Sequence, residues 1–278
     1  MKIPPLPCAE YLVCYNKLMA MKTYIMGNWK MNFTVGESSL FLHKLQTKLH
    51  SSHSLQVVVA PSLVALQPLS LQVDRRKIKL AAQNFYHRDF GAFTGEVSIS
   101  QLRNLVDYAI IGHSERRHIL GESDRDITLK VAAAIRNGLT PVLCIGETSE
   151  ERKNGETADV IRDQLLSGLE EVSSEDISKV IIAYEPVWAI SSTKDSAPAT
   201  PDVISEVIKL IRGTLASTFG EEITEQTSVL FGGSVKPTNA AAYLGIPGVN
   251  GLLIGGASLV APEFLDIIET AKRIQNDK

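Results

Sequence analysis

The octapeptide Ala-Tyr-Glu-Pro-Val-Trp-Ala-Ile at residues 183–190 decides the fold, because it places an acid directly after a buried apolar strand. The run 180–183 predicts a parallel strand buried on both faces, and Pro186 ends its regular pairing. A carboxylate in that place costs solvation energy unless it has a chemical role. Glu185 is therefore a candidate functional residue, with an ordinary surface glutamate as the alternative interpretation.

The same pattern recurs along the chain, where short β-branched or aliphatic runs are followed by polar residues or glycines. These followers are Asn28-Trp-Lys30, Gly112-His113-Ser-Glu115, Gly232-Gly-Ser234 and Gly255-Gly256. Polar stretches with helical periodicity, such as 40–45 and 203–211, separate the runs. The runs predict eight strands, at residues 24–26, 57–60, 78–82, 108–111, 141–145, 180–183, 229–231 and 252–254.

Eight parallel strands with right-handed helical crossovers can close into a barrel or lie open as a doubly wound sheet. The count of eight favours the barrel, as do polar or glycine residues after nearly every strand instead of after the first alone. In a barrel the C-terminal strand ends meet at one rim, so these distant residues would lie together. We predict an α/β protein, a single-domain (β/α)8 TIM barrel at residues 21–278.

The composition excludes several classes of partner. The 278 residues carry a formal net charge of -3, and their scattered Lys and Arg give no basic field for nucleic acid. No run is long and apolar enough to span a membrane. Cys8, Cys14 and Cys144 lack metal-ligand spacing, and an odd count argues against a disulfide framework. We therefore expect a reducing, cytoplasmic location and no metal site.

Residues 1–20 differ from the remainder of the chain. A proline-rich start precedes a short apolar run at 11–15, which polar residues bracket too closely for a signal peptide. Met21 directly precedes the first predicted strand. We expect residues 1–20 to be a disordered leader or extension, with a secretion signal as the alternative.

Five motifs at the ends of predicted strands resemble the triosephosphate isomerase family. They are Asn28-Trp-Lys-Met-Asn32, Ile111-Gly-His-Ser-Glu-Arg116, Tyr184-Glu-Pro-Val-Trp188, Phe231-Gly-Gly-Ser-Val235 and Gly251-Leu-Leu-Ile-Gly-Gly-Ala-Ser258. They occur in the family's order, and the resemblance extends from about Met21 to near the C-terminus. It implies a cofactor-free aldose–ketose isomerase that interconverts D-glyceraldehyde 3-phosphate and dihydroxyacetone phosphate through an enediolate.

The resemblance implies that Glu185 is the catalytic base, which removes a proton from the carbon next to the substrate carbonyl. His113 would be the electrophile, and it precedes a predicted helix whose positive end favours a neutral imidazole. Lys30 and Asn28 would support the developing oxyanion, with Glu115 orienting this part of the site from behind. Taken alone, the histidine and the lysine would be a structural histidine and a solvated surface charge.

Glycine pairs after the seventh and eighth predicted strands favour a phosphate site, because barrels commonly bind phosphate there through backbone N–H groups. A lone Gly-Gly is usually a turn, but two pairs on adjacent strands favour the phosphate interpretation. The resemblance assigns this role to Ser234, Gly255 and Gly256. Ser191 would add an N–H from the family's lid.

Residues 191–200 depart from the family's pattern, because they are about three residues longer than its Gly-Thr-Gly lid tip and contain no glycine. Length alone adds only about 0.3 kcal/mol of loop-closure entropy. A left-handed tip position without glycine would cost about 1 kcal/mol or more. Phe231 replaces the expected tyrosine, and the missing hydroxyl removes about 1 kcal/mol of hydrogen bonding. We expect a weaker or differently held lid.

Residues 84–97 resemble the family's long third loop, which docks beside the active site of a second subunit. A simple surface loop is the alternative. The resemblance therefore implies a homodimer, with Thr94 at the interface. Cys144 would be the family's buried cysteine, with a packing role rather than a nucleophilic one.

Two other functions stay open at this point. Another phosphate-binding barrel, such as a sugar-phosphate lyase or epimerase, would need a Schiff-base lysine or a metal-ligand cluster, and neither is evident in the sequence. A non-catalytic triose-phosphate binder would have no need for a base opposite an electrophile. The set Asn28, Lys30, His113 and Glu185 therefore favours the enzyme.

Overall fold

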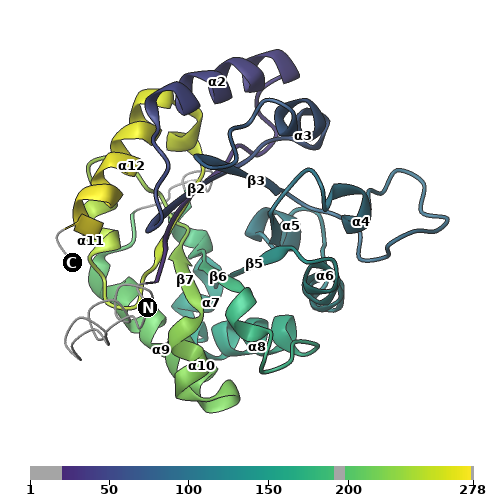
Figure 1. Ribbon diagram of the computed structural model, residues 1–278. Coiled ribbons are helices and arrows are strands. Elements are labelled where there is room, and N and C mark those ends of the chain that lie inside the picture. The colour runs from purple at the N-terminus through teal and green to yellow at the C-terminus, as the bar shows by residue number, and fades with distance from the viewer. Residues whose placement is uncertain (1–20, 191–197, 277–278) are drawn as a thin grey trace, which may run out of the picture.

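The structure is a computed structural model that describes residues 21–190 and 198–276, and its eight parallel strands form a closed barrel ringed by helices (Figure 1). The strands pair in chain order, and β8 closes on β1 with Gly251 opposite Tyr24. This confirms the predicted (β/α)8 barrel. The predicted leader, residues 1–20, lies outside the described ranges. The strands are β1 (Thr23–Asn28), β2 (Leu55–Ala60), β3 (Ile78–Ala82), β4 (Tyr108–Ile111), β5 (Thr140–Ile145), β6 (Ile181–Tyr184), β7 (Ser228–Phe231) and β8 (Gly251–Ile254).

The helices form the outer layer of the barrel and pack their apolar sides against the strands (Figure 1). The α-helices are α2 (Val35–Lys48), α3 (Leu63–Ser70), α4 (Ile99–Leu102), α5 (Ser114–His118), α6 (Asp124–Arg136), α7 (Ser149–Lys153), α8 (Thr157–Leu169), α9 (Pro201–Phe219), α10 (Glu221–Gln226), α11 (Ala240–Leu244) and α12 (Ala261–Asn276). Three short 3₁₀ helices are η1 (Ile177–Lys179), η2 (Val187–Ala189) and η3 (Gly256–Leu259).

Helix starts follow from local side chains as well as from the apolar pattern. The Thr34 side chain accepts from the Glu37 N–H while the Glu37 carboxylate accepts from Thr34, which closes a capping box at the start of α2. In α9, Ile204, Ile208 and Ile211 are buried at helical spacing and cover the barrel wall. Both helices contain the stretches predicted to be helical.

The predicted strands match the observed ones closely, with one shift. β3 and β4 have the predicted bounds, but the sixth strand begins at Ile181 and not at residue 180. The Val180 N–H instead donates to the Ile177 carbonyl at 3.0 Å and ends η1. At the other end Tyr184 still pairs with Ile145, so Glu185 follows the strand directly.

Side chains inside the barrel form a second apolar cluster, separate from the larger one between strands and helices. Successive residues of a strand point to opposite faces, so every second residue points inward. In β6, for example, Ile181 and Ala183 point inward and Ile182 belongs to the outer cluster. The inner cluster comprises Met26, Val58, Ala60, Ala81, Ile110, Val142, Cys144, Ile181, Ala183, Leu230 and Leu253.

A buried ionic network ties the segment after β3 to the segment after α5. The Lys130 ammonium pairs with the Glu122 carboxylate, and these two side chains are 6% and 2% exposed. Lys130 also donates to Asn84 Oδ1 at 2.8 Å, and Arg116 Nε lies 3.2 Å from Glu122 Oε2. Removing one partner of such a pair leaves an uncompensated buried charge.

We predict that Glu122→Ala lowers the free energy of unfolding by about 3–5 kcal/mol, because the Lys130 ammonium stays buried without its carboxylate. Urea unfolding at fixed protein concentration measures the loss. Arg162→Ala is the control, because its pair with Asp159 is exposed and worth at most about 0.5 kcal/mol. Equal losses in the two variants would contradict the assigned role of the network.

Candidate functional site

The inward alternation of the strands continues past their C-terminal ends and places polar groups around one cavity. Asn28 follows Met26 on β1, Glu185 follows Ala183 directly after β6, and both keep the inward direction, whereas Lys30 reaches the cavity from the turn after β1. The cavity has a volume of about 20 Å³. It is lined by Asn28, Lys30, His113, Glu185, Ile190, Gly232, Gly233, Leu253 and Gly255. Four of the sequence-predicted catalytic residues and one predicted phosphate residue therefore meet there.

Glu185 is 3% exposed, and both of its carboxylate oxygens have polar contacts. Oε1 lies 3.2 Å from His113 Nε2, and Oε2 accepts from the Ser114 N–H at 3.2 Å. The Glu185 N–H donates to the Ile145 carbonyl at 2.8 Å, which holds the residue in line with the barrel wall. These bonds offset the desolvation that burial imposes on the carboxylate.

The ring of His113 is oriented by the helix that it precedes. It is the N-cap residue of α5, and its Nδ1 accepts from the Glu115 N–H at 3.2 Å. An imidazole nitrogen that accepts a hydrogen bond carries no proton, so in the neutral ring the proton lies on Nε2. That N–H points toward the Glu185 carboxylate in the cavity.

Lys30 has a backbone angle that a lysine rarely adopts, with φ at 51°. Its N–H donates to Asn28 Oδ1 at 3.0 Å, and its carbonyl accepts from Gln83 Nε2 at 2.9 Å. Its ammonium lies 2.6 Å from Glu115 Oε1. The two hydrogen bonds thus hold the strained backbone of Lys30 in place, and the ion pair with Glu115 holds its ammonium at the cavity.

Gly232 leaves space for the acid on the neighbouring strand. A Cβ at this position would lie 2.9 Å from Glu185 Cγ and 3.4 Å from its Oε1. Real Cβ atoms essentially never make contacts under 3.0 Å, so a side chain here would displace the carboxylate. The first glycine of the Gly-Gly-Ser turn is therefore required by the position of Glu185.

Of the predicted phosphate-binding residues, only Gly255 lines the cavity among those that the structure describes. Gly255 borders the cavity, where a Cβ added to it would lie 3.7 Å from Lys30 Cε, and Gly256 opens η3 next to it. The Ser234 N–H donates to the Ala189 carbonyl at 3.1 Å, so an anion would have to compete with that bond. Ser191 lies outside the described residues.

Glu147 is a buried residue of the site's support that the sequence reasoning missed. Its carboxylate accepts from the Tyr184 hydroxyl at 3.2 Å and from Trp188 Nε1 at 2.9 Å, and Arg152 Nη1 lies 3.4 Å away. The Arg152 guanidinium also lies 4.5 Å over the Trp188 ring. Burial and the Glu147 charge raise the pKa of Tyr184, so its hydroxyl stays a donor. Glu147 thus holds both sides of the segment that carries Glu185.

The sequence reasoning also missed Gln83, although Gln83 directly follows the apolar strand β3 and the predicted site residues follow strands in the same way. It donates to the carbonyls of Lys30 and Ala60 at 2.9 and 2.8 Å. Cys144 is buried below the site, and burial together with the Glu185 charge raises the pKa of its thiol, which agrees with a packing role.

The described ranges contain no group of three or more His, Cys, Asp or Glu side chains arranged to hold a metal ion. A membrane-crossing helix would need more length and apolar character than any helix has in this part of the chain.

Comparison with known proteins gives one consistent result. The model of the triosephosphate isomerase family matches residues 23–271. The chain is 42% identical over 253 residues to a triosephosphate isomerase of Chloroherpeton thalassium, which covers 90% of this chain and 99% of that protein. It is 42% identical over 245 residues to one of Clostridium perfringens, covering 88% and 97%. With one of Chlamydia trachomatis it shares 44% over 250 residues, covering 89% of each.

We predict that Glu147→Ala lowers the free energy of unfolding by about 3 kcal/mol, because the Tyr184 hydroxyl and the Trp188 N–H lose their acceptor in a buried place. Glu147→Gln keeps one acceptor oxygen and should lose less. Chemical denaturation followed by the fluorescence of Trp29 and Trp188 measures both. Glu150→Ala, on the exposed side of α7, is the control, and a Glu147→Ala loss no larger than that of the control would contradict this assignment.

Proposed function

Because the chain belongs to the triosephosphate isomerase family, we propose that the cavity at the C-terminal rim is where it interconverts D-glyceraldehyde 3-phosphate and dihydroxyacetone phosphate. The activity is an aldose–ketose isomerisation. One observation carries the assignment of the site: the Glu185 carboxylate lies 3.2 Å from His113 Nε2, in the cavity that Lys30 and Asn28 also line. A base thus faces an N–H donor and a cation across one small cavity.

Glu185 acts as the base. A cavity of about 20 Å³ has room for about one water molecule. Substrate therefore takes the place of the contacts that the carboxylate makes with His113 and Ser114. The carboxylate then removes a proton from the carbon next to the carbonyl, and the freed electron pair forms the double bond of the enediolate. The proton returns to the neighbouring carbon, so no oxidant is consumed.

His113, Lys30 and Asn28 stabilise the charge that develops on the carbonyl oxygen. The proton on His113 Nε2 can be donated to that oxygen and passed between the two substrate oxygens. The Lys30 ammonium supplies a fixed positive charge, and Glu115 holds it at 2.6 Å. Donors that are oriented before the reaction starts stabilise the transition state without reorganising.

The phosphate lies on the side of the cavity bordered by the two glycine pairs. Gly255 and Gly256 let the backbone approach it closely, and Ser234 donates its N–H once the bond to Ala189 is broken. Ser191, which lies outside the described residues, supplies a further N–H. Phosphate binding would therefore release the Ala189 carbonyl, close to the base.

We predict that Glu185→Gln lowers kcat by about a hundred- to ten-thousandfold, because an amide cannot accept the substrate proton. A coupled assay for dihydroxyacetone phosphate formed from glyceraldehyde 3-phosphate measures the loss, with exposed Glu225→Gln as the control. A chelator should leave the wild-type rate unchanged, whereas a metal-dependent lyase or epimerase would lose its activity. A folded wild type that binds phosphate without turnover would favour the non-catalytic binder.

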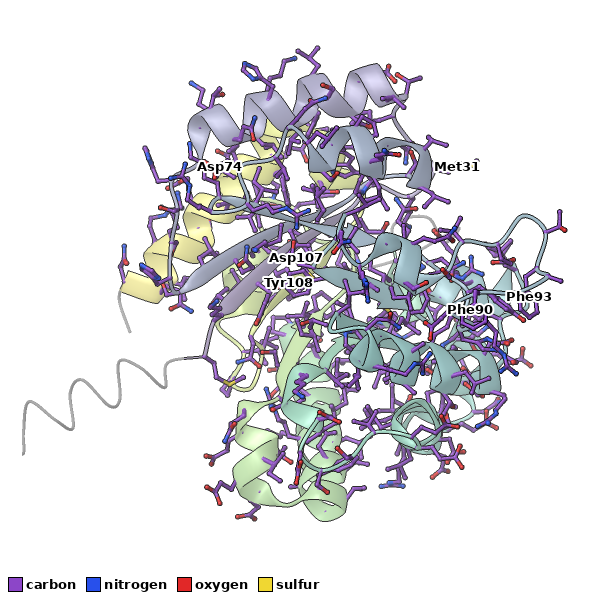
Figure 2. All side chains as sticks on the ribbon, turned by 45° about the vertical axis from the view of Figure 1, so that its right-hand side comes forward. Met31, Asp74, Phe90, Phe93, Asp107 and Tyr108 are labelled. Carbon is purple, nitrogen blue, oxygen red and sulfur yellow. The ribbon has the colours of Figure 1, made fainter. Side chains whose placement is uncertain are left out.

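The loop between β3 and α4 supports a second proposal, that the protein is a homodimer. This loop projects from the barrel in Figure 1, and Figure 2 shows its Phe90 and Phe93 on the same side of the molecule as Met31. Met31 is 97% exposed and Phe90 is 90% exposed. Large apolar side chains gathered on one side mark an interaction surface.

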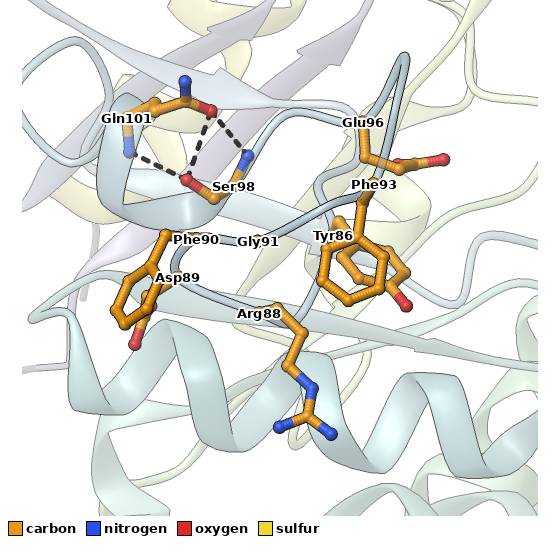
Figure 3. Close-up of a pocket in the computed structure, with 9 residues that line it drawn as sticks. All are labelled: Tyr86, Arg88, Asp89, Phe90, Gly91, Phe93, Glu96, Ser98 and Gln101. Carbon is orange, nitrogen blue, oxygen red and sulfur yellow. Dashed lines mark hydrogen bonds between the residues drawn. The ribbon is translucent and has the colours of Figure 1, made fainter.

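A cavity of about 360 Å³ lies in the same loop (Figure 3). Phe93 packs on Tyr86 with ring centroids 4.6 Å apart, and Ser98 and Gln101 close a capping box at the start of α4 beside them. The loop is therefore ordered before it meets a partner, which reduces the entropy cost of association. A second copy of the chain would use the same surface on both subunits.

We predict that wild type sediments as a dimer at micromolar concentration and that Phe90→Asp with Phe93→Asp yields monomers, because the charges cannot be buried at the interface. Thr94→Arg should also raise the fraction of monomer. Leu71→Asp changes another exposed apolar residue, outside the loop, and should stay dimeric. A wild-type monomer that is fully active at nanomolar concentration would contradict the proposal.

We also propose that the protein works in the cytoplasm. Cys144 is a free, buried thiol, and a reducing compartment keeps such thiols free. This location agrees with the place in glycolysis that the family implies.

A further inference from the structure

The segment between β7 and the end of α11 holds the chain on both sides of residues 191–197. The Ser234 N–H donates to the Ala189 carbonyl at 3.1 Å. The Tyr243 hydroxyl donates to the Ala199 carbonyl at 3.1 Å. Ala189 ends η2, directly after the segment that carries Glu185, and Ala199 lies just before α9. One structural unit therefore contacts the chain where it leaves the site and where it returns to the barrel, and of these two bonds the one to Ala199 is kept when phosphate takes the Ser234 N–H.

The Tyr243 bond is buried at both of its ends. Tyr243 and Ala199 are each 3% exposed. Burial raises the pKa of Tyr243, so its hydroxyl keeps its proton and donates at neutral pH. A buried carbonyl that loses its donor is left desolvated and unpaired, which makes this single bond important for the position of Ala199.

The ring of Tyr243 connects this bond to the strand end beside the base. It packs on Phe231 with centroids 4.5 Å apart and an interplanar angle of 51°. Phe231 is fully buried, ends β7, and also contacts the ring of Tyr184, the residue before Glu185. Phe231 has no hydroxyl of its own, so the polar contact from this aromatic pair to the backbone before α9 comes from α11 and not from β7.

We propose that Tyr243 is a positioning residue for the isomerisation, acting through its hydroxyl on the Ala199 carbonyl. The inference rests on the proposed function of the Glu185 site. Tyr243 touches no reacting group, so its removal leaves the chemical step intact. It instead lowers the fraction of molecules in which the Tyr243 ring and Phe231, the strand end beside the base, are placed for binding, and the apparent dissociation constant rises in inverse proportion to that fraction.

The test compares wild type with Tyr243→Phe, which removes the hydroxyl and keeps the ring. Because one hydrogen bond is lost, KM for glyceraldehyde 3-phosphate and the Kd for inorganic phosphate should each rise about fivefold, with kcat within about twofold of wild type. Hydrogen exchange of the Ile204 amide, which donates to the Thr200 carbonyl at 3.1 Å in the first turn of α9, should become faster. Tyr108→Phe is the matched control, because it removes a tyrosine hydroxyl from a partly buried residue at the N-terminal end of β4, and it should leave KM, Kd, kcat and amide exchange unchanged.

Two outcomes overturn the proposal. One is a Tyr243→Phe variant with wild-type KM, phosphate affinity and amide exchange, and the other is a Tyr108→Phe variant that loses as much. A wild type that binds phosphate without isomerase activity would contradict the proposed function instead, and the phosphate and exchange measurements would still test the bond to Ala199.

Discussion

Closure of eight parallel strands forces every second residue of each strand into the barrel, and the site depends on this alternation. Small and aliphatic side chains fill the interior up to the rim. One step further along the same faces, Asn28, Glu185 and Gly255 line a shared cavity, which Lys30 reaches from the turn after β1. Residues more than two hundred positions apart in the sequence therefore lie together because the barrel closes, although they make no strand pairing with one another. The register of the strands sets the geometry of the chemistry.

Three buried acids illustrate how the fold tolerates charge in a dry place. Glu122 is neutralised by Lys130, and Glu147 accepts bonds from an aromatic hydroxyl, an indole N–H and a guanidinium. Glu185 instead accepts from one backbone N–H and lies beside the His113 imidazole. Under the proposed mechanism, substrate displaces these two contacts. The acid that we propose as the base is thus held by other partners than the two supporting acids.

The sequence predicted the architecture and five of the nine residues that line the cavity, because these follow from apolar runs, from what comes after them and from the family's motifs. It missed Glu147 and Gln83, although both lie after strands, because their partners belong to distant segments and cannot be inferred from local spacing. Likewise, the bond from Tyr243 to Ala199 depends on how α11 packs, which no periodicity records. The sixth strand was shifted by one residue because η1 takes the Val180 N–H. Side-chain partners, unlike strand faces, require the folded chain.

The left-handed backbone at Lys30 has a consequence for anyone who redesigns this protein. A glycine would adopt a φ of 51° without strain, and a search for greater thermal stability would select it there. That choice would delete the ammonium next to Glu115 and leave the cavity without its cation. Under the proposed mechanism, resistance to heat and catalysis therefore make opposite demands on this one residue. An automated stabilisation of this scaffold should exclude position 30 from its choices.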